Sequence, residues 1–276
     1  MSRIRILLTV IALILLAGCQ PVMESTYLAV LNDSEGQGEV MYIDGNLKQV
    51  ASLKCENIEQ AVQCGDIVYL SSDGSDYQGY YISQSRKANR LKNVQGELLY
   101  GLANGNYVSR TDDGVCFCAK GEKVLSQDIS VLMIACYGDE LFIIDQSLNL
   151  HCYDADTLQQ KTLTMLSQDE YIGFTEADGK FCLVSRGGVS ILKDGRVEMT
   201  YVYPQIFDEL ENCLAGRIFV YEGDELAVYR LSFSGYSLKL DLEKEERYYR
   251  EINIDQLFAS RIAQGSSLIF FTEAEN

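Results

Sequence analysis

The sequence predicts an all-β fold, a β-propeller, on three observations. Apolar runs of strand length, each led by a glycine, recur about every 40 residues between Gly65 and Gly265. Turn-forming dipeptides such as Asp73-Gly74 and Asn104-Gly105 lie between these runs, as tight hairpins require. Signals for helices are few. Four-stranded propeller blades repeat at this interval, so a ring of such blades accounts for the period.

The repeat is a glycine followed by β-branched, aromatic or aliphatic residues. Successive glycines are 40, 33, 41, 37 and 49 residues apart. The copies are Gly65–Leu70, Gly105–Val108, Gly138–Ile144, Gly179–Val184, Gly216–Tyr221 and Gly265–Phe271. Tyr27–Leu31 lies where a further copy would fall, and seven copies favour seven blades over six. About 26 strands can be counted, between the roughly 24 of six blades and the roughly 28 of seven, so six blades stay open.

A propeller closes by pairing strands from the two ends of the chain in one blade, which removes free sheet edges. We therefore expect Leu268–Phe271 to join the blade that contains Tyr27–Leu31.

The clearest unit runs from Gly138 to Leu163. Leu141–Ile144 leads through a polar turn to Leu150–Tyr153, and Lys161–Thr164 supplies an outer strand. The series Leu-x-x-Tyr-Asp-Ala-x-Thr-Leu that begins at Leu150 resembles the repeats of quinoprotein-like and YVTN-like β-propellers. The chain has no Trp, a residue that many propeller repeats carry.

Two segments in the last third of the chain depart from the strand pattern. Phe207–Leu214 has the spacing of two helical turns and ends before Gly216, and Leu242–Arg247 is a charged excursion. We interpret both as insertions or strand connections in a longer sixth unit.

The first 18 residues predict a secretory signal peptide. Arg3 and Arg5 precede the apolar run Ile6–Leu16, which is too short for a comfortable transmembrane helix, and the small residues Ala17 and Gly18 follow.

The sequence Leu16-Ala17-Gly18-Cys19 resembles the lipobox of bacterial lipoproteins. The resemblance implies that the Cys19 thiol receives a diacylglyceryl group, and that cleavage makes Cys19 the N-terminus, tethered by acyl chains such as palmitate. It predicts a signal peptide at 1–18, a lipidated tether at 19–25 and a propeller domain at 26–276. The domain would face the extracytoplasmic side of the cell membrane or the outer membrane. An uncleaved anchor, or a secreted protein with a chance cysteine, is the alternative.

The charge balance excludes one class of partner. The chain has 23 Lys and Arg against 40 Asp and Glu, a net charge of −17. Such a chain does not bind nucleic acid through counterion release, and its acidity suits a soluble domain beside an anionic membrane.

Eight cysteines remain once Cys19 is assigned to the lipid, and whether any of them form disulfides is left open by the sequence. Cys55 and Cys64, which flank a short polar segment, are the best candidate pair. Cys116 and Cys118 share a strand face and cannot easily bridge each other, and several others lie in apolar runs as small buried hydrophobes. The full set is Cys55, Cys64, Cys116, Cys118, Cys136, Cys152, Cys182 and Cys213.

No set of residues in the sequence predicts catalysis, a cofactor or a metal. The single histidine, His151, is most simply a residue on a strand face, and there is no CxxC pair, P-loop or GxSxG motif. Asp33–Glu39 and Ser72–Asp76 contain calcium-type ligands, but acidic hairpin loops are the favoured interpretation. The tyrosine pairs Tyr80-Tyr81, Tyr201/Tyr203 and Tyr248-Tyr249 form either strand cores, which we favour, or a recognition surface.

These observations favour a lipid-anchored extracytoplasmic propeller that acts as a protein- or ligand-binding scaffold at the bacterial cell envelope. The expected partners are the membrane, through Cys19, and an envelope protein or a small ligand. The alternative is a propeller hydrolase, a lactonase or glycan-cleaving enzyme, that uses channel carboxylates with calcium. Fold alone does not decide between them.

Overall fold

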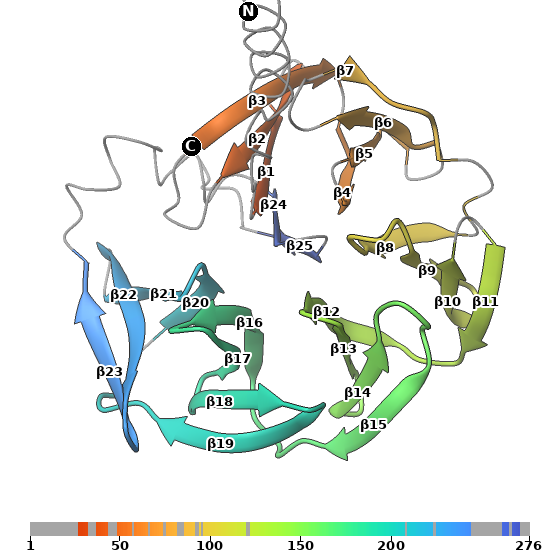
Figure 1. The fold of residues 1–276 in the computed structure, drawn as a ribbon. Helices are drawn as coiled ribbons and strands as arrows, with labels where there is room; N and C mark the ends of the chain where they lie inside the picture. Colours follow the sequence, from red (N-terminus) through yellow and green to blue (C-terminus); the bar gives the residue numbers. More distant parts are fainter. Residues whose placement is uncertain are drawn as a thin grey trace, which may run out of the picture.

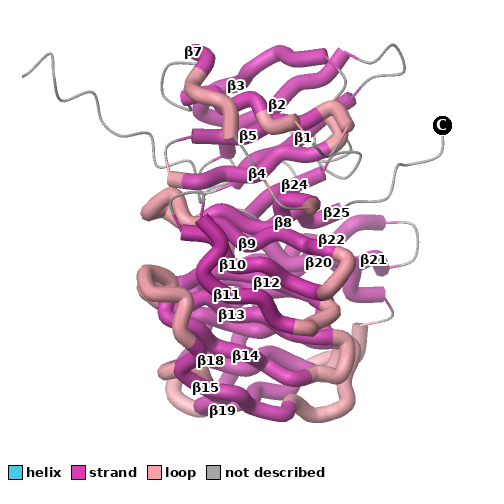
Figure 2. Tube along the Cα trace, turned by 90° about the vertical axis from the view of Figure 1, so that its right-hand side faces the viewer, coloured by secondary structure: helices cyan, strands magenta, loops and turns pink. Residues whose placement is uncertain are grey.

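The computed structural model describes residues 27–32, 37–43, 49–56, 58–65, 67–73, 76–81, 86–91, 94, 96–119, 122–207, 209–222, 225–243, 261–264 and 267–270. These residues form antiparallel sheets arranged as blades in a ring (Figure 1). The tube view in Figure 2 shows strands and loops in this part of the chain and no helix. The predicted propeller is therefore confirmed.

Blades 1 to 3 are built from the N-terminal half of the chain and two C-terminal strands. Blade 1 has the order β25 (Ser267–Phe270), β24 (Arg261–Gln264), β1 (Tyr27–Asn32), β2 (Gln37–Ile43), β3 (Gln49–Glu56). Blade 2 contains β4 (Gln60–Cys64), β5 (Ile67–Ser71), β6 (Gln78–Tyr81) and β7 (Arg86–Lys87). Blade 3 contains β8 (Glu97–Gly101), β9 (Tyr107–Thr111), β10 (Gly114–Ala119) and β11 (Glu122–Gln127).

Blades 4 to 6 follow the chain in order, each with four strands from the centre outward. Blade 4 contains β12 (Val131–Tyr137), β13 (Glu140–Asp145), β14 (Asn149–Asp154) and β15 (Gln160–Met165). Blade 5 contains β16 (Tyr171–Ala177), β17 (Lys180–Ser185), β18 (Gly188–Lys193) and β19 (Arg196–Val202). Blade 6 contains β20 (Glu209–Leu214), β21 (Arg217–Glu222), β22 (Glu225–Ser234) and β23 (Ser237–Leu242).

The described strands form six sheets, so the favoured number of seven blades is wrong. Each of the seven copies of the repeat contributes a strand, but the strands of the first and the last copy, β1 and β25, lie in the same sheet. The strand at Tyr27–Leu31 pairs with β24, and β24 pairs with β25, which contains Leu268. The expected closure between the two ends of the chain is confirmed, and this shared blade is why seven copies make six blades.

Blade 1 also holds one strand more than the other blades. β25 lies inside β24 at the centre of the ring, where it contacts β4, β8 and β12 of three other blades (Figure 1). The C-terminal hairpin therefore occupies part of the central channel.

The core lies between consecutive blades, because each middle strand is buried on both faces. In β13, Leu141 and Ile143 pack against blade 3, whereas Phe142 and Ile144 pack against blade 5. Successive side chains of a strand point to opposite faces, so burial on both sides requires a continuous apolar run. This is the physical origin of the glycine-led apolar repeat in the sequence.

In blades 2 to 6, the glycine that leads each run forms the turn between the first and second strands. Gly138 and Gly179 have φ angles of 61° and 67°, a region that glycine adopts without strain. Asp178, which precedes Gly179, also has a positive φ of 50°, as expected of an Asp-Gly hairpin turn.

Phe207–Leu214 is not helical: residues 209–214 form the strand β20, so the interpretation as helical turns is wrong. A register shift between Leu210 and Asn212 inserts one extra residue into this strand. The bulge brings Leu210 and Cys213, three residues apart, onto the same face against blade 5. That spacing of three imitates a helical period. Residues 244–247 of the second segment lie outside the described residues.

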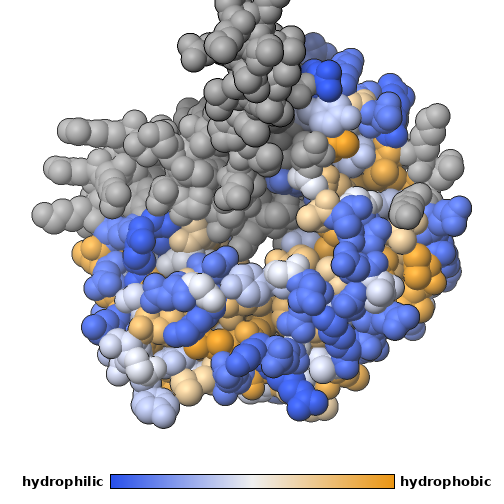
Figure 3. All heavy atoms as spheres, viewed as in Figure 1, coloured by the Kyte–Doolittle hydropathy of each residue, from blue (hydrophilic) through white to orange (hydrophobic). Residues whose placement is uncertain are grey.

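The face seen in Figure 3 is mainly hydrophilic, with hydrophobic side chains in smaller groups. In the part of the chain that the structure describes, no helix combines the length and apolar character needed to cross a membrane.

Candidate functional site

A neutral groove lies at the outer ends of blades 5 and 6, between β19 and β23. We call it the tyrosine groove, and its volume is about 530 Å³. It is lined by Met199, Thr200, Tyr201, Val202, Tyr236, Ser237 and Leu238. None of these seven side chains is charged, although charged residues make up 23% of the chain. The groove therefore suits an uncharged ligand surface.

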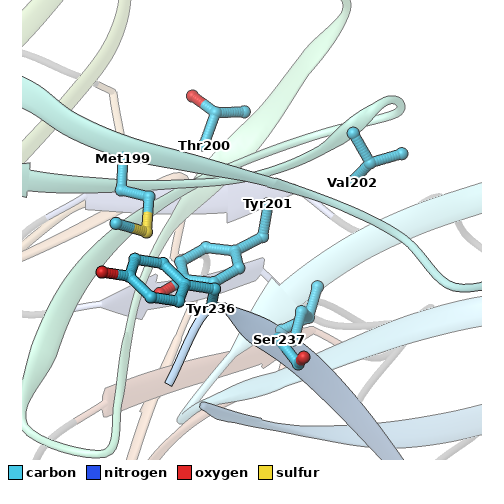
Figure 4. Close-up of a pocket in the computed structure, with 7 residues that line it drawn as sticks. Met199, Thr200, Tyr201, Val202, Tyr236 and Ser237 are labelled. Carbon is cyan, nitrogen blue, oxygen red and sulfur yellow. The ribbon is translucent and has the colours of Figure 1, made fainter. Parts of the chain in front are cut away.

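Alternation along β19 decides which side chains form the floor of the groove. Met199 and Tyr201 pair with Ile191 and Val189 and face blade 6, where all four belong to one core cluster. Figure 4 shows Met199, Tyr201 and Tyr236 directed toward one another, while Thr200 and Val202 project from the opposite side of β19.

Tyr201 is held rigidly. Its hydroxyl donates a 3.1 Å hydrogen bond to the carbonyl oxygen of Gly235, and its ring lies 5.1 Å from that of Phe233. The backbone N–H of Phe233 donates to the Asp178 carboxylate at 2.8 Å, and Lys180 Nζ lies 4.6 Å from the Phe233 ring centroid. The turn of blade 6 is thus fastened to blade 5, so the floor of the groove is formed in advance of any binding.

Tyr236, by contrast, stands at the tip of the β22–β23 turn with 89% of its surface exposed. Val202 is 78% exposed on the neighbouring strand. Exposed aromatic side chains at a turn tip contribute little to folding, and Tyr is enriched where proteins bind one another. The fold therefore leaves Tyr236 available for recognition.

The predicted tyrosine pairs divide between core and surface. Tyr201 and Tyr203 are both buried, at 6% and 8% exposure; Tyr201 lies at the floor of the groove, and burial raises the pKa of the Tyr203 hydroxyl. Tyr81 lies beneath the Arg86 guanidinium, 4.9 Å from the centre of its ring, and the pair at 248–249 lies outside the described residues.

Tyr236, the exposed residue of the groove, was not predicted from the sequence. Its signal was an aromatic residue directly after Gly235 in a hairpin turn, where polar residues are usual.

His151 is a fixed residue of the interface between blades 3 and 4. Its Nε2 lies 3.0 Å from Asp145 Oδ2, its Nδ1 lies 3.4 Å from Gln160 Nε2, and the side chain is largely buried. Burial opposes the charge of Asp145, but hydrogen bonds from His151 and from Asn149 outweigh it and lower the pKa of that carboxyl. Both ring nitrogens thus have partners that orient the ring.

All eight described cysteines are free, so the candidate bridge between Cys55 and Cys64 is wrong. The reason is the alternation of β4: Cys64 faces blade 3, whereas Cys55 packs between blades 1 and 2. The sheet of blade 2 separates the two thiols. Burial raises the pKa of Cys64 to about 12, so this thiol is protonated and unreactive at neutral pH. Cys116 Sγ and Cys118 Sγ share a face at 3.6 Å.

Of the two loops with calcium-type ligands, the first lies mainly outside the described residues. In the second, Asp73 Oδ1 accepts hydrogen bonds from Ser71 Oγ and the Asp76 backbone N–H, and Asp76 pairs with Arg90 at 2.7 Å. Within the described ranges, no group of three or more His, Cys, Asp or Glu side chains has an arrangement that could hold a metal ion. Cys19 lies outside the described residues.

No family model and no curated protein sequence matches the chain. Solved structures do. Hsv2 from Kluyveromyces marxianus is 10% identical over 80% of this chain and 82% of its own, with a TM-score of 0.50. A chain of the mitotic checkpoint complex is 10% identical over 75% of this chain and 72% of its own, again with a TM-score of 0.50.

A third similar structure is bacterial. PorZ, described as an essential surface component of the type-IX secretion system of Porphyromonas gingivalis, is 11% identical, with a TM-score of 0.50. The match covers 80% of this chain but 32% of PorZ. At these identities the likeness shows the fold alone, which is the propeller described above.

Proposed function

We propose that this chain is a lipid-anchored β-propeller at the extracytoplasmic face of a bacterial membrane, and that its tyrosine groove binds a protein partner. One observation carries the binding role: a preformed, uncharged groove with the exposed Tyr236 over the fixed Tyr201, in a protein of net charge −17.

The occupant we propose is an extended segment of a partner protein. β19 and β23 are the outermost strands of their sheets, so each presents an unpaired backbone edge beside the groove. An extended segment can pair with such an edge and place alternate side chains into the hollow. We expect an aliphatic or aromatic side chain to enter between Tyr236 and Met199, where rings and a thioether adapt to apolar groups.

The anchor rests on Leu16-Ala17-Gly18-Cys19. Two acyl chains on Cys19 suffice for stable attachment, because each buried methylene contributes about 0.8 kcal/mol. The propeller fold also occurs in PorZ, a bacterial surface component, so the fold is compatible with this location. In metabolic labelling with an alkyne-tagged fatty acid, the native chain should take up label and Cys19→Ala should take up none. Equal labelling of both would overturn the anchor.

The binding role is tested with a photo-crosslinking amino acid at position 236 of the full chain in its native cell. The matched control carries the same amino acid at Asp156, an exposed turn residue at the corresponding hairpin position of blade 4. We expect a discrete crosslinked protein at position 236 and none at 156. The neighbour, once purified, should bind the native chain at least tenfold more tightly than Tyr236→Ala.

Identical crosslinks at both positions, or equal affinity of the purified neighbour for Tyr236→Ala, would exclude the groove as the binding site. Calcium-dependent hydrolysis of a lactone or glycan panel by the purified chain, without any specific neighbour, would instead favour the hydrolase alternative.

A further inference from the structure

Two thiols lie side by side inside the interface between blades 2 and 3. Cys116 and Cys118 are two residues apart on β10, so both side chains point to the face of blade 3 that packs against blade 2. Their Sγ atoms are 3.6 Å apart, and the two residues are 0% and 2% exposed. They form a preorganised pair of sulfur atoms, the ligand type that soft metal ions prefer.

The neighbouring strand β9 places a hydroxyl group opposite each thiol. Ser109 is the register partner of Cys116, and Tyr107 is the register partner of Cys118, so all four side chains share one face. Ser109 is fully buried, and its Oγ has no hydrogen-bond partner among the residues that the structure describes. Tyr107 is 1% exposed, and its hydroxyl has only the Cys118 thiol, a weak hydrogen-bonding group, beside it.

These two hydroxyl groups point to a ligand. Buried hydroxyls without a strong acceptor cost stability, and native folds rarely keep them without a reason. A thiolate is a stronger acceptor than a thiol because it carries a full negative charge. Deprotonation of Cys116 and Cys118 would therefore satisfy both hydroxyls, provided that a cation balances the charge inside the core.

The thiol pair lies near one end of its strands, which shortens the path of an ion from solvent. Cys118 is the residue before the end of β10, and Tyr107 begins β9. Gly101, the last residue of β8, pairs with Tyr107, and the Cys64 thiol packs directly over it from the end of β4. Cys64 is 6% exposed and belongs to the same core cluster as the pair.

The number of ligands selects the metal. Within the described part of the chain, no group of three or more His, Cys, Asp or Glu side chains could hold an ion, which argues against a four-ligand Zn²⁺ site. Cu(I) is a soft ion that favours thiolates and is satisfied by two of them.

The sulfur spacing also fits a shared metal better than a disulfide. A metal bonded to two thiolates at about 2.3 Å holds their sulfur atoms up to about 4.6 Å apart, so a pair at 3.6 Å opens by about 1 Å at most. A disulfide requires closure to about 2.05 Å. Residues two apart on a strand are about 6.8 Å apart at Cα, the upper limit for such a bond.

We propose that Cys116 and Cys118 bind one Cu(I) ion as a bis-thiolate, with the hydroxyl groups of Tyr107 and Ser109 donating hydrogen bonds to the sulfur atoms. The copper bonds to both sulfur atoms, the two thiol protons leave to solvent, and the copper stays in the +1 state, so no oxidant or reductant is needed. The resulting complex carries one negative charge, which the two hydroxyl donors stabilise.

Proton release makes the binding depend on pH. Burial raises the pKa of Cys118 to about 11, and the neighbouring Tyr107 offsets this only in part. This thiol is therefore protonated at neutral pH, and Cu(I) must displace its proton. The affinity for Cu(I) should rise with pH over the range from pH 6 to pH 8.

The test is a competition titration of the reduced full chain, in non-ionic detergent without oxygen, with Cu(I) buffered by the chelator bicinchoninate. The native chain should withdraw one Cu(I) from the chelator, and Cys116→Ala and Cys118→Ala should each abolish this. Tyr107→Phe, which removes only the hydroxyl, should weaken Cu(I) binding about tenfold. The matched control, Cys152→Ala, removes a fully buried thiol from β14, the third strand of blade 4 as β10 is of blade 3, and should bind Cu(I) like the native chain.

Copper X-ray absorption of the native chain tests the site without any substitution, and it should show two sulfur neighbours. Failure of the native chain to compete for Cu(I), an equal loss in Cys152→Ala, or nitrogen and oxygen neighbours in place of sulfur would overturn the proposal. These results do not depend on the tyrosine groove, which lies between blades 5 and 6.

Discussion

The tyrosine groove and a second hollow, whose lining from blades 1 and 2 includes Glu56, Asp76 and Arg90, occupy equivalent places in the fold but differ in chemistry. Each lies at the outer end of an interface between neighbouring blades, and their volumes are similar, about 530 and 480 Å³. The first has no charged side chain, whereas the second has six. The propeller thus supplies hollows at two of the interfaces between its blades, and the residues of the outer strands and turns decide the chemistry of each hollow.

The largest expected effect concerns an ion-pair cluster in the interior of blade 6, away from the tyrosine groove. Glu243, just after β23, accepts hydrogen bonds from Arg217 at 2.8 Å and from Arg230, and the Arg217 side chain is only 4% exposed. Glu243→Gln removes the carboxylate that pairs with the buried Arg217 guanidinium, so we expect a loss of about 3–5 kcal/mol in the free energy of unfolding. Urea denaturation measures it. Arg230→Gln, which removes the exposed partner, should cost less than about 1 kcal/mol.

The second effect tests whether the hollows are confined to the outer ends of the interfaces. Between blades 2 and 3 the packing is closed: a Cβ on Gly101 would lie 2.0 Å from Cys64 Sγ and 2.4 Å from the Gln63 carbonyl oxygen. Gly101→Ala should destabilise the fold by about 3 kcal/mol. Adding Cys64→Ala should restore part of the loss, since it removes the sulfur. A fully stable Gly101→Ala variant would mean that this interface is as open as the outer hollows.

The third effect is a pH dependence that belongs to blade 6. Burial raises the pKa of Glu243, but the hydrogen bonds and charges of Arg217 and Arg230 outweigh it, so its pKa in the folded protein is lowered. A lowered pKa stabilises the fold above the unfolded value of about 4.3, and this stability is lost as the pH falls through the folded pKa. The stability difference between the native chain and Glu243→Gln should therefore shrink below about pH 4. A difference that stays constant from pH 7 to pH 3 would show that Glu243 does not act through its charge.

The smallest effects should come from the exposed residues that we assign to binding. Tyr236→Ala and Val202→Ala each alter an exposed side chain of the tyrosine groove, so we expect changes in unfolding free energy within about 0.5 kcal/mol. Circular dichroism melts of both variants measure this. A loss of several kcal/mol in either would show that the side chain supports the fold, which would remove the contrast between a structural interior and free outer hollows.

The blades could be predicted from the sequence because their cause is local. A strand buried on both faces needs an uninterrupted apolar run, as at Leu141–Ile144, and the turn before it needs a positive φ, which Gly138 supplies. The strand at 209–214 was mistaken for helical turns because a bulge gives Leu210 and Cys213 a spacing of three on one face. Bulges depend on a partner strand, and a single stretch of sequence does not show one.

The sequence by itself determined the repeat, its apolar strands and their turns, since these follow from side-chain alternation and backbone conformation within a few residues. It also predicts the tether at Cys19. Only the tertiary structure decided the number of blades, because that depends on whether the first and last copies pair with each other. It alone placed Cys55 and Cys64 on opposite sides of a sheet and brought Tyr236 over Met199. Such contacts join residues far apart in the chain, and packing between blades, rather than local sequence, sets their distances.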